Sequence, residues 1–232
     1  MKIKDLKVGD ILFMRGSGFI PTSISKLTSV KGADFSHAAI YVGDGEVFDT
    51  IGNTKRSISQ AFLKKSQNKN KGGSDIRKLR NVLKRTVPNK LGVARLDYNF
   101  SRQKMLDVCE CLRGQRYTSL VEMIAPYSAH FDLKVYSSES SPLWFKNLLT
   151  ASRNLAKSEA KIFKIYRLSR GNDRYCSSLA ICCIQYYLGD KVQVLRDCKV
   201  DLVQLSPNDL FEQCRKDKKF KVFYMDHPKM KN

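Results

Sequence analysis

The sequence predicts an α+β fold in which an antiparallel β-sheet packs against one central helix. Residues 37–50 read as two strands of β-forming residues joined by a glycine-rich turn at 43–45, which is typical of a β-hairpin. Residues 172–189 follow a helical pattern that is apolar almost all round and closes at Gly189. A helix of that kind is expected to be buried against the sheet.

Further strands are predicted on both sides of the hairpin. The predicted strands are an apolar run within residues 6–16, the two hairpin strands (37–42 and 46–50) and residues 90–98. Residues 64–80 are polar, basic and contain glycine, and we expect them to form a mobile loop between strands.

Capping residues indicate where the helices begin and end. The helix predicted at 101–114 has apolar residues at positions i, i+4 and i+7 and closes at Gly114. Asn172 or Asp173 is expected to cap the central helix. A last short helix at 205–216 begins with a serine followed by a proline, which suits a first helical turn.

Length and composition indicate a single domain over residues 1–232, because the chain is long enough for one substantial core. An apolar content of 42% and an aromatic content of 10% are those of a folded protein. Two segments are expected to stand apart from this core. They are a basic loop at about 53–90 and a helical insertion at about 119–170 with an apolar cluster around Trp144.

The chain is strongly basic, with a formal net charge of +20. Residues 53–104 carry 15 basic and only two acidic side chains, so this segment is expected to attract an anionic membrane or cell-wall surface. A solvated basic loop with no partner remains the alternative. Specific nucleic-acid binding is not expected, because no basic motif here is interleaved with aromatic residues.

The cysteine pattern and the lack of membrane signals bear on cofactors and location. Seven cysteines without paired spacing predict no structural zinc site, and we expect no metal or other cofactor. Residues 1–10 contain no apolar segment of the signal-peptide type, and no apolar run is long enough to span a bilayer. The expected location is the cytoplasm, or another cell if the chain is exported as an effector by a dedicated secretion system.

One cysteine and one histidine stand where a nucleophile and its base could be held. Cys176 lies at the start of the central helix, where unpaired backbone N–H groups and the helix dipole stabilise a thiolate. His37 begins a hairpin strand, a rigid place for a base, whereas His130 and His227 do not. The hairpin turn brings Asp49 of the second strand near His37, so this carboxylate can orient the imidazole.

These residues also have a purely structural interpretation. A cysteine in an apolar helix is more often a core residue than a nucleophile, and a single histidine on a strand is usually structural. Composition and spacing therefore leave a cysteine hydrolase as a hypothesis with a structural alternative.

Four segments in order resemble the circularly permuted NlpC-type papain-like cysteine hydrolases (the YaeF/YiiX group), which are related to lecithin:retinol acyltransferase-like proteins. They are VGDILFMRG (8–16), SHAAIYVGDGEVFDTIG (36–52), RYCSSLA (174–180) and SPNDLFEQ (206–213). The resemblance implies a permuted papain-like fold in which the histidine strand precedes the cysteine helix.

By the same resemblance, Cys176 matches the nucleophile, His37 the general base and Asp49 the third polar residue. Related enzymes more often have glutamate or a second histidine at the third position, so Glu46 is the fallback. Tyr175 and Tyr117 are candidates to line the substrate pocket; as aromatic residues they suit the core equally well.

The expected function is a thiol hydrolase that cleaves an amide or ester acyl bond through a thioester, with a Cys-His-Asp triad. The first substrate class is peptide amide, including peptidoglycan peptides, as in the wider NlpC superfamily. The alternative is a lipid acyl hydrolase or acyltransferase, phospholipase-like, at anionic membranes. A second alternative is a non-enzymatic basic binding module on the same scaffold.

Overall fold

The computed structural model describes residues 2–17, 21–22, 25, 33–51, 73–114, 116–117, 173–174, 176–189, 194–195 and 205–225. Its elements, in chain order, are η1 (Ile3–Asp5), β1 (Ile11–Gly16), β2 (His37–Gly43), β3 (Glu46–Ile51), β4 (Gly73–Lys78), α3 (Leu79–Leu83), β5 (Thr86–Leu96), α4 (Arg102–Cys111), β6 (Arg116–Tyr117), β7 (Asp173–Arg174), α9 (Cys176–Leu188), α10 (Pro207–Lys216) and β8 (Phe220–Met225). The predicted helical insertion at 119–170 lies outside the described residues.

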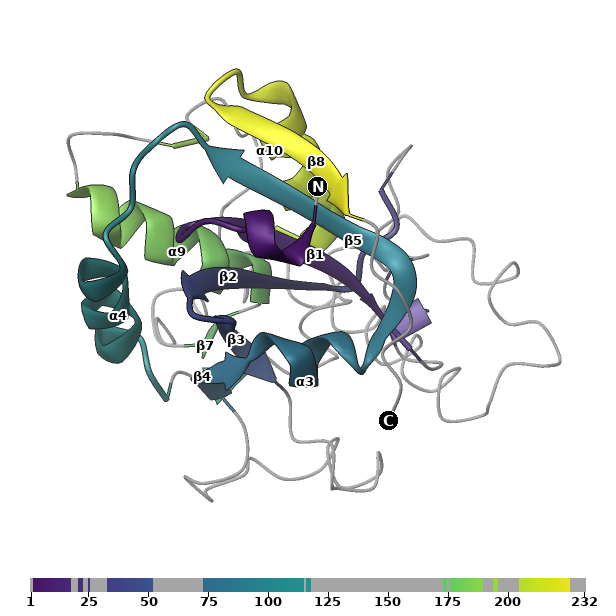
Figure 1. Ribbon diagram of the computed structural model, residues 1–232, viewed down its shortest axis with the longest axis horizontal. Helices are drawn as coiled ribbons and strands as arrows, with labels where there is room; N and C mark the ends of the chain where they lie inside the picture. Colours follow the sequence, from purple (N-terminus) through teal and green to yellow (C-terminus); the bar gives the residue numbers. More distant parts are fainter. Residues whose placement is uncertain are drawn as a thin grey trace, which may run out of the picture.

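Six strands form one antiparallel sheet in the order β4-β3-β2-β1-β5-β8 (Figure 1). The two short strands β6 and β7 pair in parallel as a separate ladder. The chain is thus an α+β protein with an antiparallel sheet, as its hairpin and helix patterns predicted.

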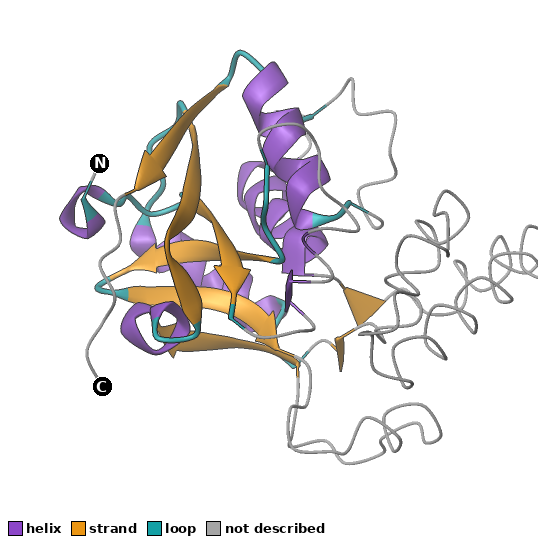
Figure 2. Ribbon diagram, turned by 90° about the vertical axis from the view of Figure 1, so that its right-hand side faces the viewer, coloured by secondary structure: helices purple, strands orange, loops and turns teal. Residues whose placement is uncertain are grey.

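The sheet separates two apolar clusters, one on each face. The larger cluster joins the sheet to α4, α9 and α10, while the smaller one lies under α3 and the N-terminal segment. Figure 2 shows the longer helices on one side of the strands and the short η1 and α3 on the other. Because the central strands are covered on both faces, they are apolar without alternation.

Strand β1 shows this double burial most clearly. Ile11 and Phe13 point into the larger cluster, whereas Leu12 and Met14 belong to the smaller one. All four side chains are at most 1% exposed. Strand β1 is therefore continuously apolar because it lies in the middle of the sheet and is covered on both faces.

The β2–β3 hairpin closes in a two-residue turn. Ile40 lies opposite Phe48, and Gly43 pairs with Glu46. Asp44 and Gly45, the two turn residues, have φ angles of 50° and 69°, the left-handed values that a type I′ hairpin turn requires. The predicted hairpin is confirmed, with Gly43 as the last strand residue.

The segment before β1 is held by a buried ion pair. Arg95 of β5 donates from Nε to Asp10 Oδ1 and from Nη2 to Asp10 Oδ2, both at 2.7 Å, and the N–H of Lys7 donates to Oδ2 at 2.8 Å. Asp10 is fully buried. At Gly9 (φ 88°), a Cβ atom would lie 2.3 Å from the ring of Phe100, so only glycine fits there.

The predicted basic loop at 53–90 is wrong for residues 73–90. These residues form β4, α3 and the first part of β5, while residues 53–72 lie outside the described part of the chain. Strand β4 (GSDIRK) is an edge strand, where the exposed charges of Asp75 and Lys78 face solvent and discourage pairing with other chains. Its polarity and its glycine are what made it resemble a loop.

The helices begin and end largely where capping residues predicted. Gly114 and Gly189 follow α4 and α9 with φ angles of 76° and 67°. Ser206 caps α10 by accepting a hydrogen bond from the N–H of Asp209 at 3.0 Å. The expected cap of α9 by Asp173 is wrong, because Asp173 belongs to β7 and the helix starts three residues later. The other candidate cap, Asn172, lies outside the described residues.

Strand β8 was not predicted from the sequence. It pairs antiparallel with β5, with Phe220 opposite Leu96 and Met225 opposite Leu91, and it is the second edge strand of the sheet. None of the described helices is both long and apolar enough to cross a membrane.

Replacing Asp10 by alanine is expected to destabilise the fold by about 3 kcal/mol, because it leaves Arg95 without its buried partner. The control is Asp97→Ala, since Asp97 is 80% exposed and lies 4.0 Å from Lys221, an exposed pair worth less than about 1 kcal/mol. Urea unfolding of both variants measures the difference. Equal losses of unfolding free energy would contradict a structural role for the Asp10–Arg95 pair.

Candidate active site

Cys176 is the first residue of α9, which packs across strands β2 and β3. The residue is 2% exposed. Its position in the first helical turn places its sulfur beside backbone N–H groups that have no partner within the helix. The predicted position of this cysteine at the helix start is confirmed.

His37 is the first residue of β2 and lies beside Cys176, to which its ring hydrogen-bonds. Its Nε2 atom is 3.1 Å from Oδ2 of Asp49. Because Nε2 takes the carboxylate, Nδ1 is the ring nitrogen available to the sulfur. The imidazole is 20% exposed, whereas the Asp49 side chain is completely buried.

The strand register explains how Asp49 reaches His37. Ile40 and Phe48 are direct partners, so Asp49 lies diagonally across from His37, displaced by two residues from a direct cross-strand pair. Diagonal neighbours on one face are within reach of longer side chains. The structure therefore brings the three predicted residues together, although His37 and Asp49 are not directly opposite each other.

Arg77 of β4 is a fourth member of this cluster that the sequence did not reveal. Its Nη1 forms an ion pair with Oδ1 of Asp49 and donates to the Asp49 carbonyl at 3.2 Å, while Nη2 donates to the carbonyl of Gly73 at 3.3 Å. The Asp49 carboxylate thus lies between the imidazole and the guanidinium. The described contacts of the Arg77 side chain are with Asp49 and Gly73, so it holds Asp49 and acts on Cys176 only through the carboxylate and the imidazole.

The pKa of Cys176 is lowered even though the thiol is buried. Burial by itself raises this pKa, but the positive charge of His37 and its hydrogen bond to the sulfur outweigh that effect. The backbone N–H groups of Ala38 and Ser177 lower the pKa further.

The pKa of His37 moves in the opposite direction. Burial lowers it, but the negative charge of Cys176 and the hydrogen bonds with Asp49 and Cys176 raise it to about 10. A thiol with a lowered pKa beside an imidazole with a raised one favours the thiolate–imidazolium pair over the neutral thiol and imidazole.

Cys183, on the same helix, shows how the pKa of a buried thiol shifts when no described histidine is in contact with it. It lies two turns further along α9, and burial raises its pKa well above the ordinary value, helped by the hydrogen bond with Cys109. Two buried thiols on one helix therefore have pKa values shifted in opposite directions. The neighbouring charge, and not burial, makes Cys176 distinctive.

Two buried polar side chains fix the backbone around the site. The Oδ1 of Asn208 accepts a hydrogen bond from the N–H of Phe35 at 2.6 Å, two residues before His37. The Ser177 hydroxyl, next to Cys176, donates to the carbonyl of Leu205. The segment that begins α10 is thus hydrogen-bonded to both the histidine strand and the cysteine helix. Asn208 of the SPND sequence and Ser177 of the CSS sequence therefore have structural roles.

The remaining predicted site residues are not part of the described cluster. Tyr175 lies outside the described residues, and of Tyr117 only the backbone, in β6, is described. Glu46, the fallback third residue, pairs instead with Lys78 at 2.8 Å and with Arg102 at 3.2 Å, at the turn end of the hairpin. Asp49 is therefore the acidic partner of His37.

No group of three or more histidine, cysteine, aspartate or glutamate side chains in the described part of the chain is arranged to hold a metal ion. Comparison of the chain with protein-family models, with curated proteins and with solved structures gave no match in any of the three.

Alkylation by iodoacetamide at pH 6 is expected to modify Cys176 in preference to the exposed Cys111, because an ordinary thiol is almost fully protonated at that pH. His37→Ala removes the charge that lowers the Cys176 pKa while burial still raises it, so labelling should then require a pH above about 8.5, the ordinary value for a thiol. Peptide mass spectrometry across pH 5–9 measures both profiles. Preferential labelling of Cys111 at pH 6, or a profile unchanged by His37→Ala, would contradict the ion pair.

Arg77→Met is expected to slow Cys176 alkylation at pH 6 by about 10- to 100-fold, because Asp49 no longer holds the imidazole in one orientation. Arg77→Lys should recover part of that loss. Arg113→Met is the matched control, since Arg113 is 45% exposed and its partners among the described residues are the surface carboxylates of Asp75 and Glu110. A similar rate in the Arg77 and Arg113 variants would show that Arg77 does not position the site.

Proposed function

We propose that this protein is a cysteine hydrolase with a circularly permuted papain-like fold of the NlpC type. The observation that carries the proposal is the contact of Cys176 with His37, in which the thiol pKa is lowered and the imidazole pKa is raised. Asp49, buried behind the imidazole, completes a nucleophile, base and orienting group. A binding module would not need this charge pair below its surface, so the enzyme is the better interpretation.

In the first half of the reaction, the Cys176 thiolate attacks the acyl carbon of the substrate and forms a carbon–sulfur bond. Backbone N–H groups at the start of α9 stabilise the oxyanion of the tetrahedral intermediate. The His37 imidazolium gives its proton to the leaving amine or alcohol as the bond to that group breaks. The acyl group is then held as a thioester.

In the second half, the neutral His37 accepts a proton from water, and the hydroxide formed adds to the thioester carbon. The carbon–sulfur bond breaks, the carboxylic acid product leaves, and the thiolate and imidazolium are restored. Asp49 keeps Nδ1 aimed at the reacting atoms in both halves and stabilises the imidazolium. In an acyltransferase, an alcohol or amine takes the place of water.

The first substrate class is the amide bond of a peptide, including peptidoglycan peptides, in keeping with the resemblance to NlpC-type enzymes. The second is a lipid ester at an anionic membrane, which one feature favours: exposed lysine and arginine side chains gather over η1 and α3. Both classes need the same thioester chemistry, so the site itself does not choose between them.

Cys176→Ala is expected to reduce hydrolysis by about ten-thousand-fold, because it removes the nucleophile that forms the thioester. The protein is incubated in parallel with purified peptidoglycan and with phospholipid vesicles, and the products are analysed by mass spectrometry. Cys183→Ala, on the same helix, should retain activity. Full activity of Cys176→Ala on the substrate that is cleaved would refute the mechanism.

A further inference from the structure

Residues 73–104, the described part of the basic segment, contain two kinds of cation. Four of them are engaged in ion pairs with carboxylates, and these are Arg77, Lys78, Arg95 and Arg102. The other cations with described side chains are exposed and form no ion pair with any described residue; they are Arg80, Lys84, Arg85 and Lys104. The described part of the segment is therefore not a uniformly basic surface, and the cations without an ion pair have to be located separately.

Six exposed cations that form no ion pair with any described residue lie on two parts of the chain that are distant in sequence. We call them the basic face: Lys2, Lys4 and Lys7 beside η1, and Arg80, Lys84 and Arg85 in and after α3. The two groups are neighbours because Ile3 of η1 and Leu83 of α3 line the same pocket. Asp5 is the one acidic residue within 2–7 and 78–85.

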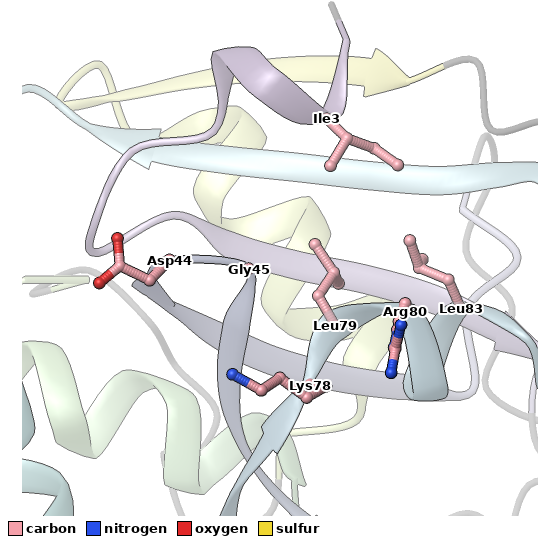
Figure 3. Close-up of a pocket in the computed structure, with 7 residues that line it drawn as sticks. All are labelled: Ile3, Asp44, Gly45, Lys78, Leu79, Arg80 and Leu83. Atoms are coloured by element: carbon pink, nitrogen blue, oxygen red, sulfur yellow. The ribbon is translucent and has the colours of Figure 1, made fainter.

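The pocket between the two groups has a volume of about 440 Å³ and combines hydrocarbon with positive charge (Figure 3). Ile3, Leu79 and Leu83 supply the apolar lining, and Arg80 and Lys78 lie beside it. Lys78 lies 2.8 Å from Glu46. The pocket also contains Asp44, whose carboxylate is engaged by Arg102 at 3.1 Å.

We propose that the basic face binds an anionic phospholipid membrane. Lipid phosphates complement the six cations, and the apolar lining of the pocket suits the glycerol and first methylene groups beneath a phosphate. Nucleic acid fits less well, because no aromatic side chain lines the pocket to stack on a base. This surface joins residues 2–7, which the sequence did not connect with the basic segment.

Membrane binding of this kind does not depend on the hydrolase chemistry. The pocket includes Gly45, at the turn end of the hairpin, whereas His37 begins β2 at the opposite end, about 20 Å away along the strand. Cys176→Ala should therefore bind vesicles as the unmodified protein does. Failure of one proposal leaves the other intact.

The test is sedimentation of the full chain with phosphatidylcholine vesicles, with or without phosphatidylglycerol. Binding is expected only with phosphatidylglycerol and should weaken as NaCl rises from about 0.1 M to about 0.5 M. Arg80→Glu and Lys4→Glu, on the two different parts of the basic face, should each lower the partition coefficient at least about fivefold. Lys218→Glu makes the same charge change in the turn after α10 and is the matched control.

Three outcomes would overturn the proposal. Equal binding to vesicles without phosphatidylglycerol would show that charge is not recognised. Equal losses in Arg80→Glu and Lys218→Glu would show that net charge acts without a defined surface. Binding of duplex DNA or RNA in the absence of vesicle binding would assign the basic face to nucleic acid. Thermal unfolding of each variant confirms that the fold is retained before binding is compared.

Discussion

The buried carboxylate of Asp49 is the constraint on which the arrangement of the site depends. Removing a charged carboxylate from water costs several kcal/mol, and only close, hydrogen-bonded partners offset that cost. His37 supplies one partner from β2 and Arg77 the other from β4, so three adjacent strands must keep one register. The hydrogen bond with Asp49 also fixes the imidazole of His37 beside Cys176. The orientation of the base therefore follows from the burial of Asp49.

The hairpin and the cysteine helix could be predicted because their signals are local. Asp44 and Gly45 adopt left-handed φ angles that few other residues accept, and the apolar pattern of 176–188 has the helical period. The proximity of His37 and Asp49 followed from the turn, because its length limits the possible registers. The contact with Cys176 is not local, and its expectation rested on the resemblance of four segments to a known family.

The parts that could not be predicted depend on pairing between distant segments. Strand β4 has a polar sequence that is also typical of a loop, and only its place at the sheet edge explains the charges. Arg77 therefore looked like one more cation in a basic segment. Strand β8 could be recognised only from its pairing with β5, and the basic face only from the pocket that η1 and α3 line together. Electrostatic roles of this kind follow from tertiary neighbours and not from composition.

The hydrogen bond from Phe35 to Asn208 closes a loop of 173 residues, and this has a consequence for biosynthesis. A contact of such high sequence separation forms slowly, and it cannot form before Asn208 has been synthesised. During translation at about 5–20 residues per second, the histidine strand leaves the ribosome many seconds before the helix that completes the nucleophile. The nascent chain therefore carries an imidazole without its thiolate until the cysteine helix has also left the ribosome.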